Sequence, residues 1–198
     1  MCAVSGIQDL IEQPPHHCLG VILAGGRSSR MGKDKATVQI GQRTMLDITR
    51  SLLDAVPLNG HIVVGGDFAD WTEQYRGNGP GRAICEVIAN IAIPASSATA
   101  YVVFVPVDMP LLTPERLQQL IQLAKITRRA VYFNEHFLPL VVPVTPVICD
   151  SLGKLTQHYA SPSVRRLLSI INAFAVTFTG AKQELSNINS PADLALLT

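Results

Sequence analysis

The chain has 198 residues, with 16 lysine and arginine residues against 15 aspartate and glutamate residues, so its formal net charge is +1. This near-balance argues against a protein that coats nucleic acid, because such proteins carry a strongly basic domain. The composition, 47% hydrophobic and 16% charged, is that of a globular protein with a filled core. No apolar stretch approaches the roughly 20 residues that a membrane-spanning helix needs. We therefore expect a cytoplasmic protein that binds neither nucleic acid nor a membrane.

The first 17 residues differ from the rest of the chain. Ser5 and Gln8 could cap a short helix that stops at Pro14 and Pro15, and the pattern of a secretory signal is missing. The later residues contain no repeat and no Gly/Ser linker. We therefore expect an N-terminal extension over 1–17 and a single domain over 18–198. The four cysteines are widely spaced and form no metal-binding pattern, which favours a reducing compartment.

Short runs rich in β-branched residues alternate with helical patterns along the domain. Strands are expected over 19–24, 61–64 and 101–105, because each run is brief and apolar, as in strands buried on both faces. Apolar residues recur at helical spacing over 43–56 and 84–91. This order implies crossover connections and a mostly parallel sheet. We predict an α/β, three-layer, doubly wound fold that binds its ligands beyond the carboxyl ends of the strands.

Helix starts in the second half of the chain share one signal, a hydroxyl residue followed by proline. The hydroxyl caps a free amide, and proline fits the first helical position. The pairs begin at Thr113, Thr145, Ser161 and Ser190. Ser190 and Asp193 also form a capping-box-like pair, so a terminal helix is expected over 191–197. Runs at 131–133 and 138–142 predict a hairpin or bulge that adds an antiparallel or edge element to the sheet.

The segment 23–35, Leu-Ala-Gly-Gly-Arg-Ser-Ser-Arg-Met-Gly-Lys-Asp-Lys, follows the first predicted strand directly. Its glycines leave backbone amides accessible, and its four cations and one aspartate give a local charge of +3. A triphosphate needs such N–H groups and cations to oppose its negative charge. Walker A and Rossmann fingerprints do not fit, because Gly25 is followed directly by Gly26 and Arg30 stands five positions after Gly25. The alternative is a surface loop with solvated charges.

This segment resembles the LAGGxSxRMGxxK pattern of nucleotidyltransferases and, within them, of molybdenum cofactor guanylyltransferases. The resemblance implies a Rossmann-like nucleotidyltransferase fold. The residues that it assigns to the nucleotide are Leu23, Ala24, Gly25, Gly26, Arg30, Gly32 and Lys35. Gly79 and Pro80 stand where the family has a GPLAG-type loop that helps hold the purine base, and Ala83 replaces the second glycine of that loop.

Base recognition is where the sequence departs from the family pattern. The family has an asparagine after the preceding strand, and Gly65-Gly66-Asp67 stands there instead. The segment 65–79 is also short for the acidic strand that the family usually has ahead of the loop. The residues that could accept the guanine N–H groups in its place are Asp67, Asp70 and Glu73. Spacing alone does not decide between guanine and cytosine.

Two further motifs carry polar residues in register with the glycine-rich segment. Asp108 follows the strand at 101–105, where one carboxylate can hold Mg²⁺, and this context resembles the metal-binding segment of the family. The alternative is that Asp108 caps a turn before the helix at Thr113. Asn187 and Asn189 belong to a segment similar to the NxNTPEDL type, and they would offer amide groups to metal, phosphate or pterin. On their own they would be an ordinary turn and cap.

The resemblance implies transfer of GMP from Mg-GTP to the terminal phosphate of molybdopterin, which gives the guanine dinucleotide cofactor and pyrophosphate. Arg30 and Lys35 would oppose the charge on the triphosphate, Asp108 would hold Mg²⁺, and Asn187 and Asn189 would bind substrate. GTP and molybdopterin are the expected ligands, with molybdoenzymes or cofactor-assembly proteins as protein partners. The alternatives are a relative that uses CTP with molybdopterin or acts on a sugar phosphate, and a non-catalytic protein of cofactor assembly.

Overall fold

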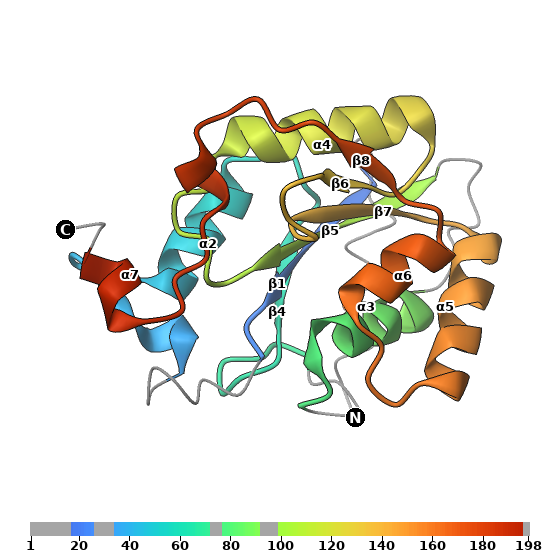
Figure 1. Ribbon diagram of the computed structural model, residues 1–198, viewed down its shortest axis with the longest axis horizontal. Helices are drawn as coiled ribbons and strands as arrows, with labels where there is room; N and C mark the ends of the chain where they lie inside the picture. The colour runs from blue at the N-terminus through green and yellow to red at the C-terminus, as the bar shows by residue number, and fades with distance from the viewer. Residues whose placement is uncertain (1–16, 26–33, 72–76, 92–98, 196–198) are drawn as a thin grey trace.

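The computed structural model describes residues 17–25, 34–71, 77–91 and 99–195. A six-stranded sheet crosses the middle of the molecule (Figure 1). Its strands are β1 (Cys18–Leu23), β4 (His61–Val64), β5 (Ala100–Pro106), β6 (Val131–Phe133), β7 (Leu140–Val144) and β8 (Phe174–Val176). They lie in the order β4-β1-β5-β7-β6-β8. A separate small hairpin pairs β2 (Gln39–Ile40) with β3 (Arg43–Thr44).

The sheet has a parallel half and a mixed half. Strand β1 pairs in parallel with both β4 and β5, and Leu23 is in register with Val64 on one side and Pro106 on the other. The carboxyl ends of these three strands therefore meet at one edge. Strand β7 runs antiparallel to β5 and to β6, which confirms the antiparallel element expected around residues 131–142.

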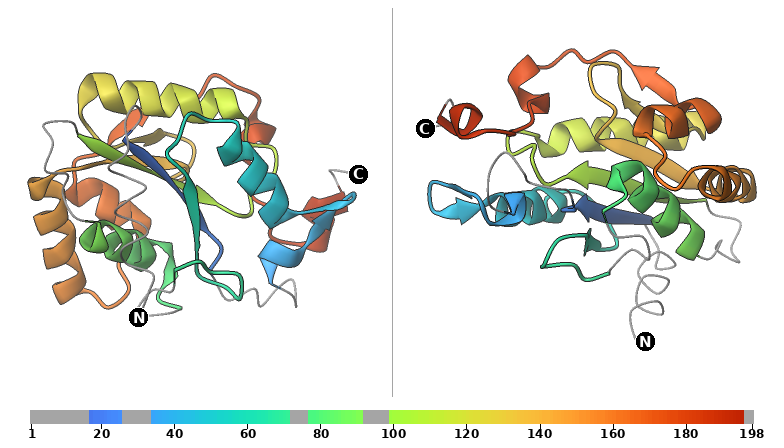
Figure 2. Two further views of the ribbon diagram at one scale, coloured as in Figure 1. Left: turned by 180° about the vertical axis from the view of Figure 1, so that it is seen from behind. Right: turned by 60° about the horizontal axis from the view of Figure 1, so that its bottom comes forward.

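Helices cover both faces of the sheet and make the three layers (Figure 2). They are α2 (Met45–Asp54), α3 (Gly79–Asn90), α4 (Pro114–Thr127), α5 (Pro146–His158), α6 (Val164–Ile170) and α7 (Pro191–Ala195), with short 3-10 helices η1 (Lys35–Thr37) and η2 (Lys182–Leu185). Alternate residues of β1 point to opposite faces. Leu19 and Val21 pack with α3, α5 and α6, whereas Cys18 and Ile22 pack with α2 and α4. The predicted α/β, doubly wound, mostly parallel fold is confirmed.

The expected helix start at Ser161 is wrong by two residues. Helix α6 begins at Val164, and Ser163 caps it by accepting the Arg166 N–H at 3.2 Å. The Ser161 hydroxyl instead donates to the Asn78 carbonyl at 2.6 Å. A tertiary partner therefore took the hydroxyl that the pattern assigned to the cap. Thr113 is the N-cap residue of α4 as expected, but its side chain makes no capping hydrogen bond within the described residues.

Two further helices begin at residues other than those expected. Helix α2 begins at Met45, because residues 43–44 pair in the small hairpin and Thr44 closes a capping box with Asp47. Helix α3 is longer than expected and starts at Gly79. Residues 1–16 and 196–198 lie outside the described part of the chain, so neither the extension nor the end of the last helix is tested. Over the described ranges, no helix combines the length and apolar character that crossing a membrane requires.

Candidate active site

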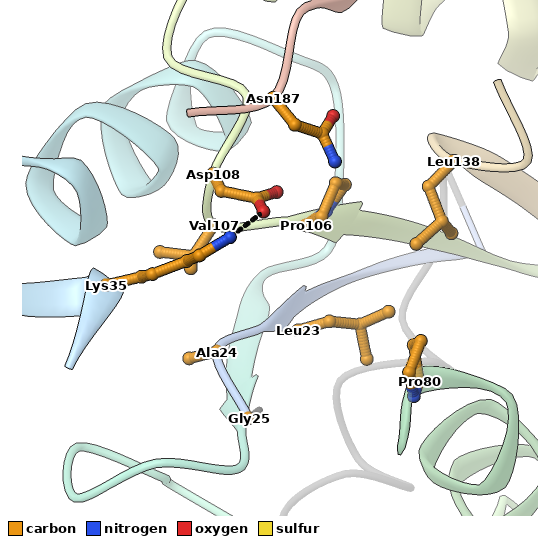
Figure 3. Close-up of a pocket in the computed structure, with 10 residues that line it drawn as sticks. All are labelled: Leu23, Ala24, Gly25, Lys35, Pro80, Pro106, Val107, Asp108, Leu138 and Asn187. Carbon is orange, nitrogen blue, oxygen red and sulfur yellow. Dashed lines mark hydrogen bonds and ion pairs between the residues drawn. The ribbon is translucent and has the colours of Figure 1, made fainter. Parts of the chain in front are cut away.

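The chain carries its candidate site at the edge where β1 and β5 end. The Ala24 N–H donates to the Val64 carbonyl at 2.9 Å, and the Val107 N–H donates to the Leu23 carbonyl at 3.1 Å, so sheet-like bonding holds the residues that follow each strand. A cavity of about 210 Å³ opens here (Figure 3). It is lined by Leu23, Ala24, Gly25, Lys35, Pro80, Pro106, Val107, Asp108, Leu138 and Asn187.

Asp108 lines this cavity because it lies two positions after the end of β5. Its side chain is 13% exposed, and its Oδ2 accepts a hydrogen bond from Lys35 Nζ at 2.6 Å. Its Oδ1 is buried and finds no hydrogen-bond partner among the described residues. A buried carboxylate oxygen without a partner is costly, which marks this atom as one that a ligand would satisfy.

Lys35 is aimed at Asp108 by the turn that carries it. Asp34 caps η1, since its Oδ1 accepts the Ala36 N–H at 3.0 Å and its backbone carbonyl accepts the Thr37 hydroxyl at 2.8 Å. The Lys35 ammonium then reaches Asp108 Oδ2 and Asn189 Oδ1, both at 2.6 Å. Figure 3 shows the lysine side chain extending toward Asp108 across the open end of the sheet. One ammonium thus joins residues from three segments far apart in sequence.

The C-terminal segment is fixed in this site by hydrogen bonds that its backbone N–H groups donate. The Ile188 N–H donates to the Asp108 carbonyl at 2.8 Å, and Asp193 Oδ2 accepts the N–H groups of Asn189 and Ser190, both at 2.9 Å. The Asn189 amide, and after it Ser190, lowers the pKa of Asp193 from its ordinary value. The Asp193 N–H bonds to Ser190 Oγ at 3.2 Å, so the expected capping pair is confirmed.

A second, larger cavity of about 740 Å³ adjoins the first and shares Asn187 with it. Its lining residues are Leu111, His136, Gln183, Ser186, Asn187, Ile188, Asn189 and Asp193. The lining combines apolar surface with neutral amide, imidazole and hydroxyl groups and the carboxylate of Asp193. Such a wall can hydrogen-bond a heterocyclic acceptor beside Lys35 and Asp108.

Gly79 and Pro80 form the start of α3, on the opposite side of the first cavity. Gly79 has φ of +82°, a conformation that favours glycine. A Cβ on Gly81 would overlap the Pro162 carbonyl, so α3 can approach the α5–α6 connection only with glycine there. Ala83 lies inside α3 with its side chain buried, and a helical backbone accepts alanine at this former glycine position.

Of the three carboxylates considered for base recognition, the structure describes Asp67 and Asp70. Asp70 Oδ2 accepts the Val63 N–H at 2.8 Å, so this carboxylate extends the hydrogen bonding of β4. Trp71 is buried and bridges to Val64, as a packing residue. Glu73 lies outside the described residues.

The structure brings several of the predicted site residues together. Those that line the two cavities are Leu23, Ala24, Gly25, Lys35, Pro80, Asp108, Asn187 and Asn189, and Gly79 lines a small recess beside them. Gly26, Arg30 and Gly32 fall in 26–33, outside the described part. Sequence reasoning missed Leu138, His136 and Gln183. Leu138 and His136 belong to the β6–β7 connection, whose position opposite Asp108 follows only from the antiparallel pairing of β7 with β5.

The donor set fits a divalent metal that arrives with phosphate ligands. No group of three or more His, Cys, Asp or Glu side chains is placed to hold a metal ion within the described ranges. Mg²⁺ in phosphate-transfer sites uses one or two carboxylates, with substrate oxygens and waters completing its shell. Asp108 matches that requirement, because one of its buried oxygens has no hydrogen-bond partner in the part of the chain that the structure describes.

The cysteines that the structure describes take no part in this site. Burial raises the pKa of the Cys18 and Cys85 thiols to about 12, so both are protonated at neutral pH. They are packing residues of the two hydrophobic cores.

Comparison with known proteins gives consistent relatives. A molybdenum cofactor guanylyltransferase from Xanthomonas euvesicatoria pv. vesicatoria is 37% identical over 177 residues, covering 87% of this chain and 89% of that protein. A probable molybdenum cofactor guanylyltransferase from Mycolicibacterium paratuberculosis is 29% identical over 90% of this chain and 93% of its own length.

Solved structures share the fold at low sequence identity. Molybdopterin-guanine dinucleotide biosynthesis protein A from Archaeoglobus fulgidus superposes with a TM-score of 0.72 at 17% identity, over 90% of this chain and 96% of that one. The 2-C-methyl-D-erythritol 4-phosphate cytidylyltransferase from Thermus thermophilus superposes at 0.61 with 13% identity, over 89% of this chain and 95% of that one. Residues 20–174 match the model of the MobA-like NTP transferase domain, and the chain belongs to that family of nucleotidyltransferases.

Proposed function

We propose that the protein transfers GMP from GTP to the terminal phosphate of molybdopterin, with release of pyrophosphate. The observation that carries this proposal is the meeting of Lys35, Asp108 and Asn189 between two adjoining cavities. The likeness to named guanylyltransferases over most of the chain supports guanine as the base and molybdopterin as the acceptor.

The chemistry is an in-line displacement at the α-phosphorus of GTP. A phosphate oxygen of the acceptor forms the new P–O bond, and the bond from the α-phosphorus to the bridging oxygen breaks, so pyrophosphate leaves with the electron pair. The protein contributes positioning and charge neutralisation. A bound divalent metal supplies Lewis-acid stabilisation of the phosphate oxygens, and we infer that this metal is Mg²⁺.

Each residue of the site has a role in this proposal. Asp108 offers its buried Oδ1 to the metal, and Lys35 donates to the triphosphate. Arg30 opposes charge on the same group, from the sequence pattern. The backbone of Leu23, Ala24, Gly25, Gly26 and Gly32 borders the phosphates, and Gly79 with Pro80 borders the base. Asn187 and Asn189 contact substrate from the second cavity.

The cellular setting is also a proposal. We infer that the domain over 18–198 works in the cytoplasm and hands its product to molybdoenzymes or cofactor-assembly proteins. The segment 1–17 is inferred to be an extension of that domain.

A nucleotide competition assay tests the proposed function. Purified protein is supplied with molybdopterin, Mg²⁺ and each of GTP, CTP, ATP and UTP, and both pyrophosphate and the dinucleotide product are measured. We expect GTP to be preferred by at least tenfold. The shared fold of a cytidylyltransferase makes CTP the specific rival, and a preference for CTP would overturn the guanine assignment. Absence of pyrophosphate with every nucleotide would indicate the non-catalytic alternative.

A further inference from the structure

The contacts of Lys35 pose a question that the proposed reaction does not answer. An ammonium has three N–H donors, and Lys35 directs two of them to groups within the protein, Asp108 Oδ2 and Asn189 Oδ1. The side chain is 21% exposed and its partner Asp108 is 13% exposed, so the pair is only partly screened by water. The proposed reaction needs the same ammonium at the phosphates and the same carboxylate at the metal.

Lysine and a metal ion compete for this carboxylate. A divalent cation at Asp108 would lie within a few ångströms of the Lys35 ammonium, and like charges repel strongly in a partly buried site. A metal ion alone would therefore displace the Lys35 ammonium from Asp108 without bringing a negative group to replace the carboxylate. A metal ion that arrives on a triphosphate brings several negative oxygens, and these can accept the displaced ammonium.

We propose that Lys35 is the internal counter-ion of Asp108 in the nucleotide-free protein, so that this site rejects free metal and accepts the metal–triphosphate complex. On binding, the ammonium would move from Asp108 Oδ2 and Asn189 Oδ1 to the phosphates, and Asp108 would hold the metal through Oδ1. This inference rests on the proposed metal role of Asp108. It adds an order to the reaction, because metal and nucleotide enter together.

The geometry of the site allows the metal to bind before the lysine leaves. Asp108 keeps a buried Oδ1 without a partner among the described residues, so one oxygen is ready for a new ligand before Lys35 leaves Oδ2. Asn189 does not depend on Lys35 for its position, because Asp193 holds its N–H at 2.9 Å. The lysine can therefore depart while the C-terminal segment stays in place.

Manganese binding tests the proposal without any turnover. Mn²⁺ is titrated into nucleotide-free protein, and free Mn²⁺ is measured by electron paramagnetic resonance, with and without a non-hydrolysable GTP analogue. Binding that persists in Asp108→Asn is subtracted. We expect wild-type protein to bind Mn²⁺ at least tenfold more weakly without the analogue than with it. The neutral variant Lys35→Gln should bind Mn²⁺ alone at least tenfold more tightly than wild type does.

Two control variants test whether Mn²⁺ binding depends on the charge beside Asp108 or on the net charge of the protein. Lys35→Arg keeps a cation beside Asp108 and should bind Mn²⁺ alone as weakly as wild type. Lys154→Gln removes the same charge from α5, where Lys154 pairs only with exposed Asp150 among the described residues, and should also behave as wild type. If Lys35→Gln does not fold, Lys35→Met is used, and its unfolding temperature should rise on addition of Mn²⁺ alone.

The outcomes distinguish this inference from the proposed function. Unchanged or weaker Mn²⁺ binding in the neutral Lys35 variants would overturn the counter-ion role, even if GMP transfer is intact. Equal Mn²⁺ affinity of wild-type protein with and without the analogue would also overturn it. Undiminished binding of Mn²⁺ with the analogue in Asp108→Asn would instead remove Asp108 as the metal ligand, and the proposed site would fail.

Discussion

Two regions of the molecule each contain an ion pair with a nitrogen–oxygen distance of 2.6 Å. The two pairs differ in sequence separation, in burial and in what surrounds them. Arg82 and Glu86 lie one turn apart on α3, with side chains 9% and 8% exposed. Arg82 Nη1 also donates to the Thr156 carbonyl at 3.2 Å, which ties α3 to α5. Lys35 and Asp108 are 73 positions apart and meet at the open edge of the sheet.

The difference separates a structural pair from a functional one. The α3 pair is local, buried and hydrogen-bonded to a neighbouring helix, as expected of a pair that fixes packing. The Lys35–Asp108 pair faces a cavity and leaves Asp108 Oδ1 without a partner within the described residues. Although the two distances are equal, the different surroundings predict different responses to mutation. Mutating the α3 pair should lower stability, and mutating the Lys35–Asp108 pair should lower turnover.

The largest effect is expected from Glu86→Gln. Removing one partner of a buried ion pair weakens the electrostatic stabilisation of the remaining charge, so the free energy of unfolding should fall by about 3–5 kcal/mol. Urea denaturation measures this, and kcat of the folded protein should stay within about threefold of wild type. Asp150→Asn in the exposed Lys154–Asp150 pair is the matched control and should cost far less. An equally small loss for Glu86→Gln would contradict the structural role.

Asp108→Asn should have the reverse profile. Loss of the metal-binding carboxylate should lower metal-dependent GMP transfer by about 10²–10³-fold, the size seen when one charge-stabilising contact is removed. The fold should be retained, with a much smaller change in urea midpoint than Glu86→Gln shows. Steady-state pyrophosphate release at saturating GTP is the measurement. Activity close to wild type would favour the view that Asp108 only caps a turn.

Lys35→Ala should reduce turnover by roughly a hundredfold, because the ammonium that opposes charge on the triphosphate is lost. The effect should appear in kcat more than in KM for GTP, since this charge grows during transfer. Lys35→Arg serves as the charge-conserving control and should recover part of the loss. A Lys35→Ala protein with a wild-type kcat would remove Lys35 from the reaction.

The smallest effect is expected at the pair that joins α4 to η2. Arg116 Nε and Glu184 Oε2 lie 2.8 Å apart, and this hydrogen bond is the main reason why the pKa of Glu184 is lowered from 4.5. A carboxyl group whose pKa is lowered in the folded protein stabilises the fold at pH values above its ordinary pKa. This stabilisation is lost as the pH falls through the lowered pKa of the folded protein. Glu184→Gln should thus lower the unfolding temperature by about 2 °C or less at pH 7, and by nothing once the pH is low enough to protonate the folded carboxyl. A loss that persists in that acid range would show that the pair is not its cause.

The sequence predicted the parts of this molecule that depend on local pattern. The strands that became β1, β4 and β5 are short apolar runs, and the polar residues that follow them lie at the predicted edge. The contact of Lys35 with Asn189 was out of reach, because it spans 154 positions and depends on how the C-terminal segment crosses the edge of the sheet. The cap at Ser161 was wrong for a related reason, since a tertiary partner took the hydroxyl. The hydrogen bond from the Val63 N–H to Asp70 also depends on tertiary structure and was not predicted.

The β6–β7 connection is a second case in which local structure could be predicted from the sequence and its position in the site could not. The apolar runs on either side of it predicted a hairpin or bulge, and the antiparallel pairing of β6 with β7 confirms that prediction. Its place in the site could not be predicted, because it depends on β7 pairing with β5 between the two halves of the sheet. Only that pairing brings Leu138 to the first cavity and His136 to the second.

A crystal structure with Mg²⁺ and a non-hydrolysable GTP analogue tests the central claim most directly. The account predicts a metal ion bound to Asp108 Oδ1, the Lys35 ammonium on the phosphates and away from Asp108 Oδ2, and the base beside Gly79 and Pro80. A nucleotide bound in another part of the molecule, with the Lys35–Asp108 pair still closed at 2.6 Å, would contradict it.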